Sequence, residues 1–302
     1  MIATISTEVG IARRNRWMPR FLRALISSPS GMLGALILLL VILVAIFANI
    51  LAPYSPDQIN MRDRLRPPSL RSSQAEEIPH YFGTDSIGRD LLSRVIHGAR
   101  ISLLLGLTAA LIGGIVGVSL GMIAGYYGNQ IDAIVSWMIN VQLAFPFTLL
   151  AIFIISIFGG GLYKLMIVLA WATWVNYARI MRGQVITIKT REYVEAAYSI
   201  GAKPLRVMVR HILPNAVSPL TVIATFTIAS AILQESSLSF LGLGVSASVP
   251  TWGSILSDGR SYLQDAWWIA TLPGIALLIT VLGANLFGDW LRDYLDPRLR
   301  IK

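Results

Sequence analysis

Long stretches without a charged residue constrain this chain more than any other feature of its sequence. No Asp, Glu, Lys or Arg occurs between Arg23 and Asp57, or between Arg100 and Asp132. A helix needs about 20 mostly apolar residues to cross the hydrocarbon core of a bilayer. Charged residues make up only 14% of the 302 residues, against roughly 25% in a soluble domain, which leaves too few to cover a soluble surface. We therefore expect an all-α, polytopic membrane protein.

Six segments are predicted to cross the membrane. They are residues 32–51, 101–124, 133–163, 165–178, 212–234 and 266–288. The third contains Pro146, which is expected to kink its helix, since proline removes a backbone hydrogen bond. The fourth has only 14 uncharged residues between Lys164 and Arg179. These two long side chains can extend it by reaching toward the interfaces.

Basic residues are distributed unequally between the two ends of the predicted helices. With both termini in the cytoplasm, the inside segments carry 16 Lys and Arg and seven acidic residues, whereas the outside segments carry nine of each. The whole net charge of +9 then lies on the cytoplasmic face, in agreement with the positive-inside rule. Five arginines precede the first helix: Arg13, Arg14, Arg16, Arg20 and Arg23. Membrane orientation therefore explains the basicity better than nucleic-acid binding does.

These assignments divide the chain into five segments. They are a basic cytoplasmic N-terminus at 1–31, the first helix at 32–51, an outer loop at 52–99, a five-helix domain at 100–289 and a cytoplasmic tail at 290–302. The helix at 101–124 contains four glycines spaced three or four residues apart, Gly113, Gly114, Gly117 and Gly121. Such spacing predicts close packing against another helix.

The distal part of the outer loop reads HYFGTDSIGRDLLSRVIHG. Its Gly-Thr-Asp turn is suited to cap a short helix beginning at Ser86. Asp85 and Arg89 are four residues apart with the acid first, as are Asp90 and Arg94, which is the favourable order on a helix. The pattern predicts an amphipathic helix at the membrane surface, and a gate or docking surface is the alternative of equal weight.

The inside segment 190–215 reads TREYVEAAYSIGAKPLRVMVRHILPN. Thr190 is a candidate N-cap, Gly201 a helix stop, and Pro204 suits the first position of a second short helix. We expect a helix–turn–helix parallel to the membrane that ends at Pro214. A solvated connecting loop is the alternative on composition alone.

The pattern Glu195-Ala-Ala-x-x-x-Gly201, followed by Leu213-Pro214, resembles the EAA loop of the membrane subunits of bacterial ABC importers. One departure is His211, where the general pattern has an apolar residue. The stretches FGTDSIGRDLLSR, LSFLGLG, PTWG and NLFGDWLRDYLDP are similar to signatures of one branch of that family. That branch is the C-type permeases of dipeptide, oligopeptide and nickel importers, within the binding-protein-dependent transport inner-membrane components. The resemblance spans about residues 23–300.

This resemblance implies a type I ABC importer permease fold, with 100–289 as the ABC transmembrane type-1 domain and coupling helices at about 190–214. It assigns coupling to an ATPase to six residues: Glu195, Ala196, Ala197, Gly201, Leu213 and Pro214. The alanines are expected to leave a shallow strip for the partner, and Glu195 a charge to pair with it. Six further residues belong to the outer signature: Gly83, Thr84, Asp85, Gly88, Arg89 and Asp90.

The expected partners also follow from the resemblance. The sequence contains no Gly-Lys pair and hence no phosphate-binding loop of the G-x-x-x-x-G-K-[ST] type. A non-catalytic subunit that binds no cofactor is therefore implied, with ATP and Mg on two cytoplasmic ATPase subunits. A homologous B-type permease completes a heterodimer in the bacterial inner membrane, and a periplasmic or lipid-anchored binding protein delivers peptides or related small solutes. The choice among dipeptide, longer peptide, glutathione-like thiol, nickel chelate and sugar stays open.

Polar residues within the predicted helices give little sign of a substrate path. Glu235 is the one acid near a span interior, and we treat it, Gln234 and Asn140 as candidates for the translocation path. A structural role for Glu235 at the end of its span is an equal alternative. Most uncharged polar residues there, among them Gln142, are expected to form hydrogen bonds between helices.

Two other classes of membrane protein compete with the ABC permease. A secondary transporter or channel usually has functional charges in its spans or paired broken helices, and neither is evident. A membrane enzyme is the second competitor, but the sequence has no H-E-x-x-H motif and no pair of acids within a span. The three histidines, His80, His97 and His211, are scattered and predict no metal site.

Overall fold

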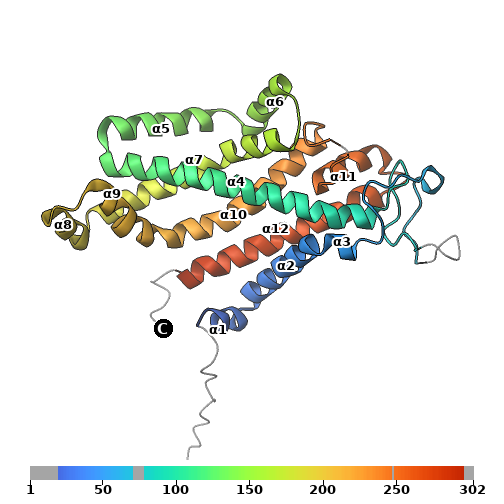
Figure 1. Ribbon diagram of the computed structural model, residues 1–302, viewed down its shortest axis with the longest axis horizontal. Helices are drawn as coiled ribbons and strands as arrows, with labels where there is room; N and C mark the ends of the chain where they lie inside the picture. Colours follow the sequence, from blue (N-terminus) through green and yellow to red (C-terminus); the bar gives the residue numbers. More distant parts are fainter. Residues whose placement is uncertain (1–19, 71–77, 247, 296–302) are drawn as a thin grey trace, which may run out of the picture.

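The computed structural model describes residues 20–70, 78–246 and 248–295 (Figure 1). Within these ranges the chain is helical and has no strand; extended backbone pairs only in an isolated bridge between Thr84 and Asp90. The predicted all-α class is confirmed. The predicted N-terminal anchor residues Arg13, Arg14 and Arg16, and residues 296–302 of the predicted tail, lie outside the described residues.

Five long helices run along the molecule (Figure 1). They are α2 (Pro29–Ile46), α4 (Leu91–Tyr127), α7 (Leu162–Lys189), α10 (Leu213–Phe240) and α12 (Trp268–Leu295). The most extensive contact joins α4 and α7. Helix α10 packs on both of them and on α12, and α12 in turn packs on α2.

The other helices are shorter. They are α1 (Arg20–Ser27), α3 (Ala48–Leu51), α5 (Asn129–Ala144), α6 (Phe147–Phe158), α8 (Glu192–Ser199), α9 (Pro204–Val207) and α11 (Trp252–Gly259), with 3-10 turns at Met61–Asp63 and Arg260–Tyr262 and a π segment at Met208–Ile212. In Figure 1, α8, α9, α1 and the last turn of α12 lie at one end of the molecule. Helices α3 and α11 and the outer loop lie at the other end. The two sides separated by the charge distribution are therefore two ends of the fold.

Among the described residues, four helices are long and apolar enough to cross a bilayer. They are α2, α4, α12 and the continuous helix formed by α9 and α10. The pair α5 and α6 counts as a fifth if it is one broken span. Its two halves are bent by 88° around Phe145 and Pro146, which confirms the predicted kink. Five of the six predicted spans thus have a counterpart of this kind.

Helix α7, the counterpart of the weakest predicted span, is much longer than the 14-residue apolar run at 165–178. At about 1.5 Å per residue, a helix of this length is about 42 Å long, enough to cross the bilayer. It carries four basic residues, Lys164, Arg179, Arg182 and Lys189. It continues past Arg179 because Met181, Val185 and Ile188 are buried on one face, and because Arg182 pairs with Asp132 of α5.

Glycines set the close approach of α4 to α7. A Cβ on Gly117 would lie 2.7 Å from Cβ of Tyr177, and one on Gly121 would lie 2.9 Å from Cα of Ala178. At Gly114 the nearest atoms would be at an ordinary 3.5 Å. The predicted close packing is confirmed, and it uses the glycine face that includes Gly117 and Gly121 rather than Gly114.

Candidate functional site

Two short helices join α7 to α10 and form what we call the elbow, residues 190–212. Arg191, rather than the predicted Thr190, is the N-cap of α8, because α7 runs on to Lys189 and Thr190 becomes its C-cap. Gly201 follows the last turn of α8 with φ +80°, a conformation in which glycine has no steric penalty, as predicted for a helix stop. Pro204 occupies the first turn of α9, also as predicted.

The second helix of the elbow is not separated from the next span at Pro214, and this part of the prediction is wrong. Helix α9 continues through the π segment Met208–Ile212 directly into α10. Pro214 is the second residue of α10 and directly follows the π segment. Leu213 is half-buried and Pro214 is exposed. The elbow is therefore joined to α10 by unbroken helical backbone.

One face of the elbow is fixed to the helical bundle. Val194, Val207 and Ile212 are completely buried and belong to one apolar cluster with Met181 and Val185 of α7. Ala197 joins the same cluster, so the two alanines of the motif point to different faces. The predicted alanine strip is consequently divided: Ala197 anchors the elbow, and only Ala196 is exposed. A cluster of this kind makes the elbow stiff.

The opposite face of the elbow is exposed and partly apolar. Ile200 and Leu205 are 86% and 69% exposed, and Glu195 is exposed as well. Glu195 forms no ion pair with any residue that the structure describes. Exposed apolar groups gathered at one end of a protein are typical of a surface that a partner covers.

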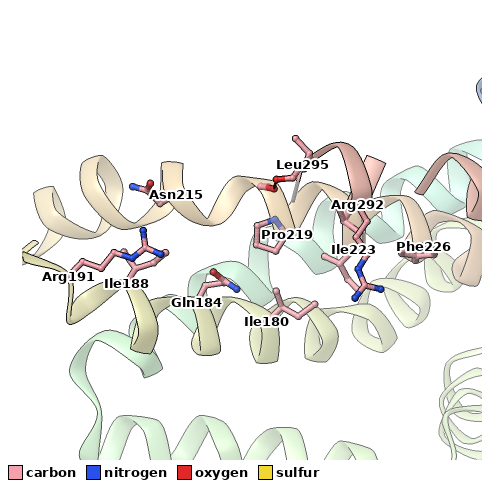
Figure 2. Close-up of a pocket in the computed structure, with 12 residues that line it drawn as sticks. Ile180, Gln184, Ile188, Arg191, Asn215, Pro219, Ile223, Phe226, Arg292 and Leu295 are labelled. Atoms are coloured by element: carbon pink, nitrogen blue, oxygen red, sulfur yellow. Dashed lines mark hydrogen bonds between the residues drawn. The ribbon is translucent and has the colours of Figure 1, made fainter. Parts of the chain in front are cut away.

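Beside the elbow, α7, α10 and α12 enclose a cavity of about 970 Å³, shown in Figure 2. It is lined by Ile180, Gln184, Ile188, Arg191, Asn215, Ser218, Pro219, Val222, Ile223, Phe226, Arg292 and Leu295. Arg191 lies at the elbow end and Arg292 comes from the last turn of α12 (Figure 2). Neither arginine was predicted as a site residue, because no spacing rule relates positions a hundred residues apart.

The outer signature forms a buried turn and not a helix. Gly83, Thr84, Asp85, Gly88, Arg89 and Asp90 are all buried. The predicted helix from Ser86 is absent, and α4 begins at Leu91 with Asp90 as its N-cap, which accepts a bond from the Ser93 N–H at 2.8 Å. Gly88, at φ +79°, lies so close to the carbonyl of Asn60 that a Cβ there would overlap it. The signature therefore serves to fold the outer loop.

Four charged side chains hold this turn against α11. Arg89 contacts Asp85 at 2.6 Å and Asp258 at 3.2 Å, and Arg94 contacts Asp258 at 3.3 Å. Arg94 is fully buried. Burial raises the pKa of the Asp258 carboxyl, and the neighbouring Arg94 and Arg89 act in the opposite direction. The result is a compact charge cluster that connects the outer loop to the C-terminal half of the chain.

The three candidates for the translocation path are not brought together. Glu235 is completely buried and accepts bonds from the hydroxyls of Ser239 at 2.7 Å and Thr251 at 2.8 Å, so it joins α10 to α11. This is the structural role given above as the alternative. Gln234 bonds to Ser230 of its own helix, and Asn140 is exposed on α5.

Gln142, in contrast, does act between helices as expected. It accepts a bond from the indole N–H of Trp174 and donates to the carbonyl of Trp171, both at 2.7 Å, which joins α5 to α7.

The helix α4 also contains a pattern typical of serine hydrolases, Gly117-Val-Ser-Leu-Gly121. In those enzymes the serine occupies a sharp turn between a strand and a helix. Here Ser119 lies inside a continuous helix and bonds to the carbonyl of Ile115 at 2.7 Å. The pattern is therefore part of the glycine packing described above. No group of three or more metal-ligating side chains occurs among the described residues.

Comparison with known proteins agrees with these observations. The profile of the family described as binding-protein-dependent transport system inner membrane component matches residues 117–301. That of the N-terminal TM domain of oligopeptide transport permease C matches residues 17–68. The fold resembles a chain of the MetNI methionine ABC transporter in inward-facing conformations, with TM-score 0.56 and 20% identity over 68% of this chain and 98% of that one.

Curated relatives cover most of the chain. The di/tripeptide transport system permease protein DppC of Pseudomonas aeruginosa is 44% identical over 88% of both chains. The oligopeptide transport system permease protein OppC of Bacillus subtilis is 39% identical over 91% of this chain and 87% of its own length. The glutathione transport system permease protein GsiD of Pectobacterium atrosepticum is 37% identical over 99% of this chain and 97% of its own length.

Proposed function

The chain belongs to the binding-protein-dependent transport system inner membrane component family, and on that premise we propose that it forms half of the translocation pathway for peptides or related small solutes. It is a permease subunit of an ABC importer and not an enzyme, since the relatives that cover its length are permeases. The single observation that carries the proposal is the stiff elbow, whose exposed face carries the motif glutamate and whose buried face is fixed to α7 and α10.

The proposed topology has six membrane spans in the bacterial inner membrane and both termini in the cytoplasm. Helix α7 is the remaining one of the six spans and the fourth in chain order, with its basic residues at the two interfaces. The arrangement of the fold supports this proposal, because α1, the elbow and the end of α12 share one end of the molecule (Figure 1). These elements belong to the segments that the charge distribution assigns to the cytoplasmic side. This topology includes the predicted domain boundaries, with the five-helix domain at 100–289.

The proposed partners bind at different ends of the molecule. Two ATPase subunits hold ATP and Mg, and one of them binds the exposed face of the elbow around Glu195, Ala196 and Gly201. A homologous B-type permease supplies the other half of the pathway. A periplasmic or lipid-anchored binding protein delivers solute to the outer end, where the folded loop provides a rigid surface.

The proposed mechanism is a lever. Closure of the ATPase dimer pushes the elbow, and the elbow moves α10 because helical backbone is continuous from Pro204 onward. The buried cluster makes α7 move with it. Rigid-body rocking of packed helices is a common way to convert a local push into alternating access. The cavity between α7, α10 and α12 lies next to the elbow and is the proposed inner part of the pathway.

The experiment is a comparison of Glu195→Lys with Glu192→Lys in the complex reconstituted into liposomes. Both glutamates are exposed on α8, so the control removes and reverses the same charge one turn away. We expect Glu195→Lys to insert and assemble but to lose coupling, measured as solute imported per ATP hydrolysed. Glu192→Lys should transport like the original chain. Normal transport by Glu195→Lys would refute the lever.

A further inference from the structure

The cavity between α7, α10 and α12 has an unusual distribution of charge. Among the described residues that line it, the two charged ones, Arg191 and Arg292, are both basic, and none is Asp or Glu. Neither guanidinium forms an ion pair with a residue that the structure describes, although Asp289 and Asp293 lie close by on α12. Both groups are therefore available to an anion that enters the cavity.

The rest of the wall fits a short, flexible solute. Ile180, Ile223 and Phe226 provide apolar surface, while Gln184 and Asn215 provide amide donors and acceptors (Figure 2). A volume of about 970 Å³ is at the upper end of the range of roughly 300–1,000 Å³ found for small-molecule sites. Arginine is the side chain best suited to a carboxylate, because its planar fork matches the two oxygens.

We propose that this cavity binds the free carboxylate of the transported solute through Arg191 and Arg292 after the solute leaves the outer half of the pathway. The proposal rests on the proposed function and adds a chemical requirement to it: the cargo carries a free carboxylate. Arg191 caps α8 in the elbow, whereas Arg292 belongs to α12. A movement of the elbow therefore changes the separation of the two guanidiniums. As a result, the site binds the carboxylate tightly in one state and weakly in another.

Direct binding to the assembled complex tests the proposal without the binding protein, whose own selectivity would interfere. The probes are radiolabelled Ala-Ala and its C-terminal amide, added without nucleotide to complexes in phosphatidylcholine nanodiscs. The complexes are first shown to co-purify and to hydrolyse ATP, so that a failure of the proposed function is seen before this measurement. We expect the acid to bind at least about tenfold more tightly than the amide, the usual size of a lost charged hydrogen bond.

Variants locate the binding. Arg191→Gln and Arg292→Gln should each weaken binding of the acid about tenfold and leave the weak binding of the amide unchanged. Arg292→Lys should restore part of it, because the charge remains. Arg179→Gln is the matched control, since it removes a positive charge from α7 outside the cavity lining.

Three outcomes would overturn the proposal. They are equal binding of acid and amide, an equal loss in Arg179→Gln, and loss of acid binding when phosphatidylglycerol replaces part of the phosphatidylcholine. The last result would assign the two arginines to a lipid headgroup.

Discussion

At the scale of single residues, the outer signature shows which information a spacing pattern contains. Asp85 and Arg89 do pair, as their spacing predicted, but in a turn and not on a helix. Gly83 and Gly88 have positive φ values, which take the backbone out of a helical path. The buried charges require partners, and one partner is Asp258, far away in the sequence. The residue types were predictable; the long-range pairing was not.

This charge cluster leads to a prediction for stability. Asp85→Asn keeps the shape of the side chain but leaves buried Arg89 and Arg94 with less negative charge. We expect a loss of roughly 3 kcal/mol or more in the free energy of unfolding, typical of breaking a buried ion pair. The apparent melting temperature of the complex measures it. Asp265→Asn, which changes an exposed acid at the same end, should have little effect, and equal melting of the two variants would contradict the prediction.

At the scale of elements, the apolar runs and Pro146 predicted the long helices well, while helix ends at charged residues were predicted poorly. The fourth span was expected to end near Arg179, but α7 continues to Lys189. Its extension has Met181, Val185 and Ile188 on one face, a helical spacing within a charged segment. Periodicity would have found the extension where hydropathy alone did not. The continuity of the elbow with α10 has no comparable signal, because proline is compatible with both a helix stop and a helix start.

The contact of α4 with α7 gives a prediction with a control on the same helix. Gly117→Ala places a methyl group against the backbone of Trp174 and the Cβ of Tyr177, so one helix must move away. We expect destabilisation of about 1–3 kcal/mol, the usual cost of overpacking. Gly114→Ala meets only ordinary contacts and should unfold like the original chain. The measurement is the melting temperature of both variants, and an equal shift of the melting temperature in the two would rule out the packing account.

The elbow turn gives a further prediction at this scale. No atom lies within 4 Å of a Cβ at Gly201, so substitution there is limited by its positive φ and not by crowding. A left-handed backbone costs roughly 1–2 kcal/mol for most residues, and less for Asn. We expect Gly201→Val to lower the solute imported per ATP hydrolysed more strongly than Gly201→Asn does. If the two variants couple equally well, backbone conformation at the turn does not control the lever.

At the scale of the whole molecule, the uneven distribution of basic residues predicted two distinct sides, and the fold gathers the corresponding segments at two ends (Figure 1). The cavity was not predictable in the same way. Its wall combines α7, α10 and α12, and Arg191 and Arg292 meet one cavity only because those helices pack together. Composition thus predicts orientation, whereas the cavity depends on tertiary packing.

The proposed orientation can be tested directly because the chain contains no cysteine. Ser199→Cys places a single thiol on the exposed end of α8, and Ser55→Cys places one in the exposed part of the outer loop. A membrane-impermeant maleimide should label Ser199→Cys only in inside-out vesicles and Ser55→Cys only in right-side-out vesicles, with the cysteine-free parent as control. The reverse pattern would put the elbow outside the cell, where no ATP-driven subunit can push it. Labelling of both positions from one side would require an even number of spans between them, in conflict with the three proposed there, α4, the α5–α6 pair and α7.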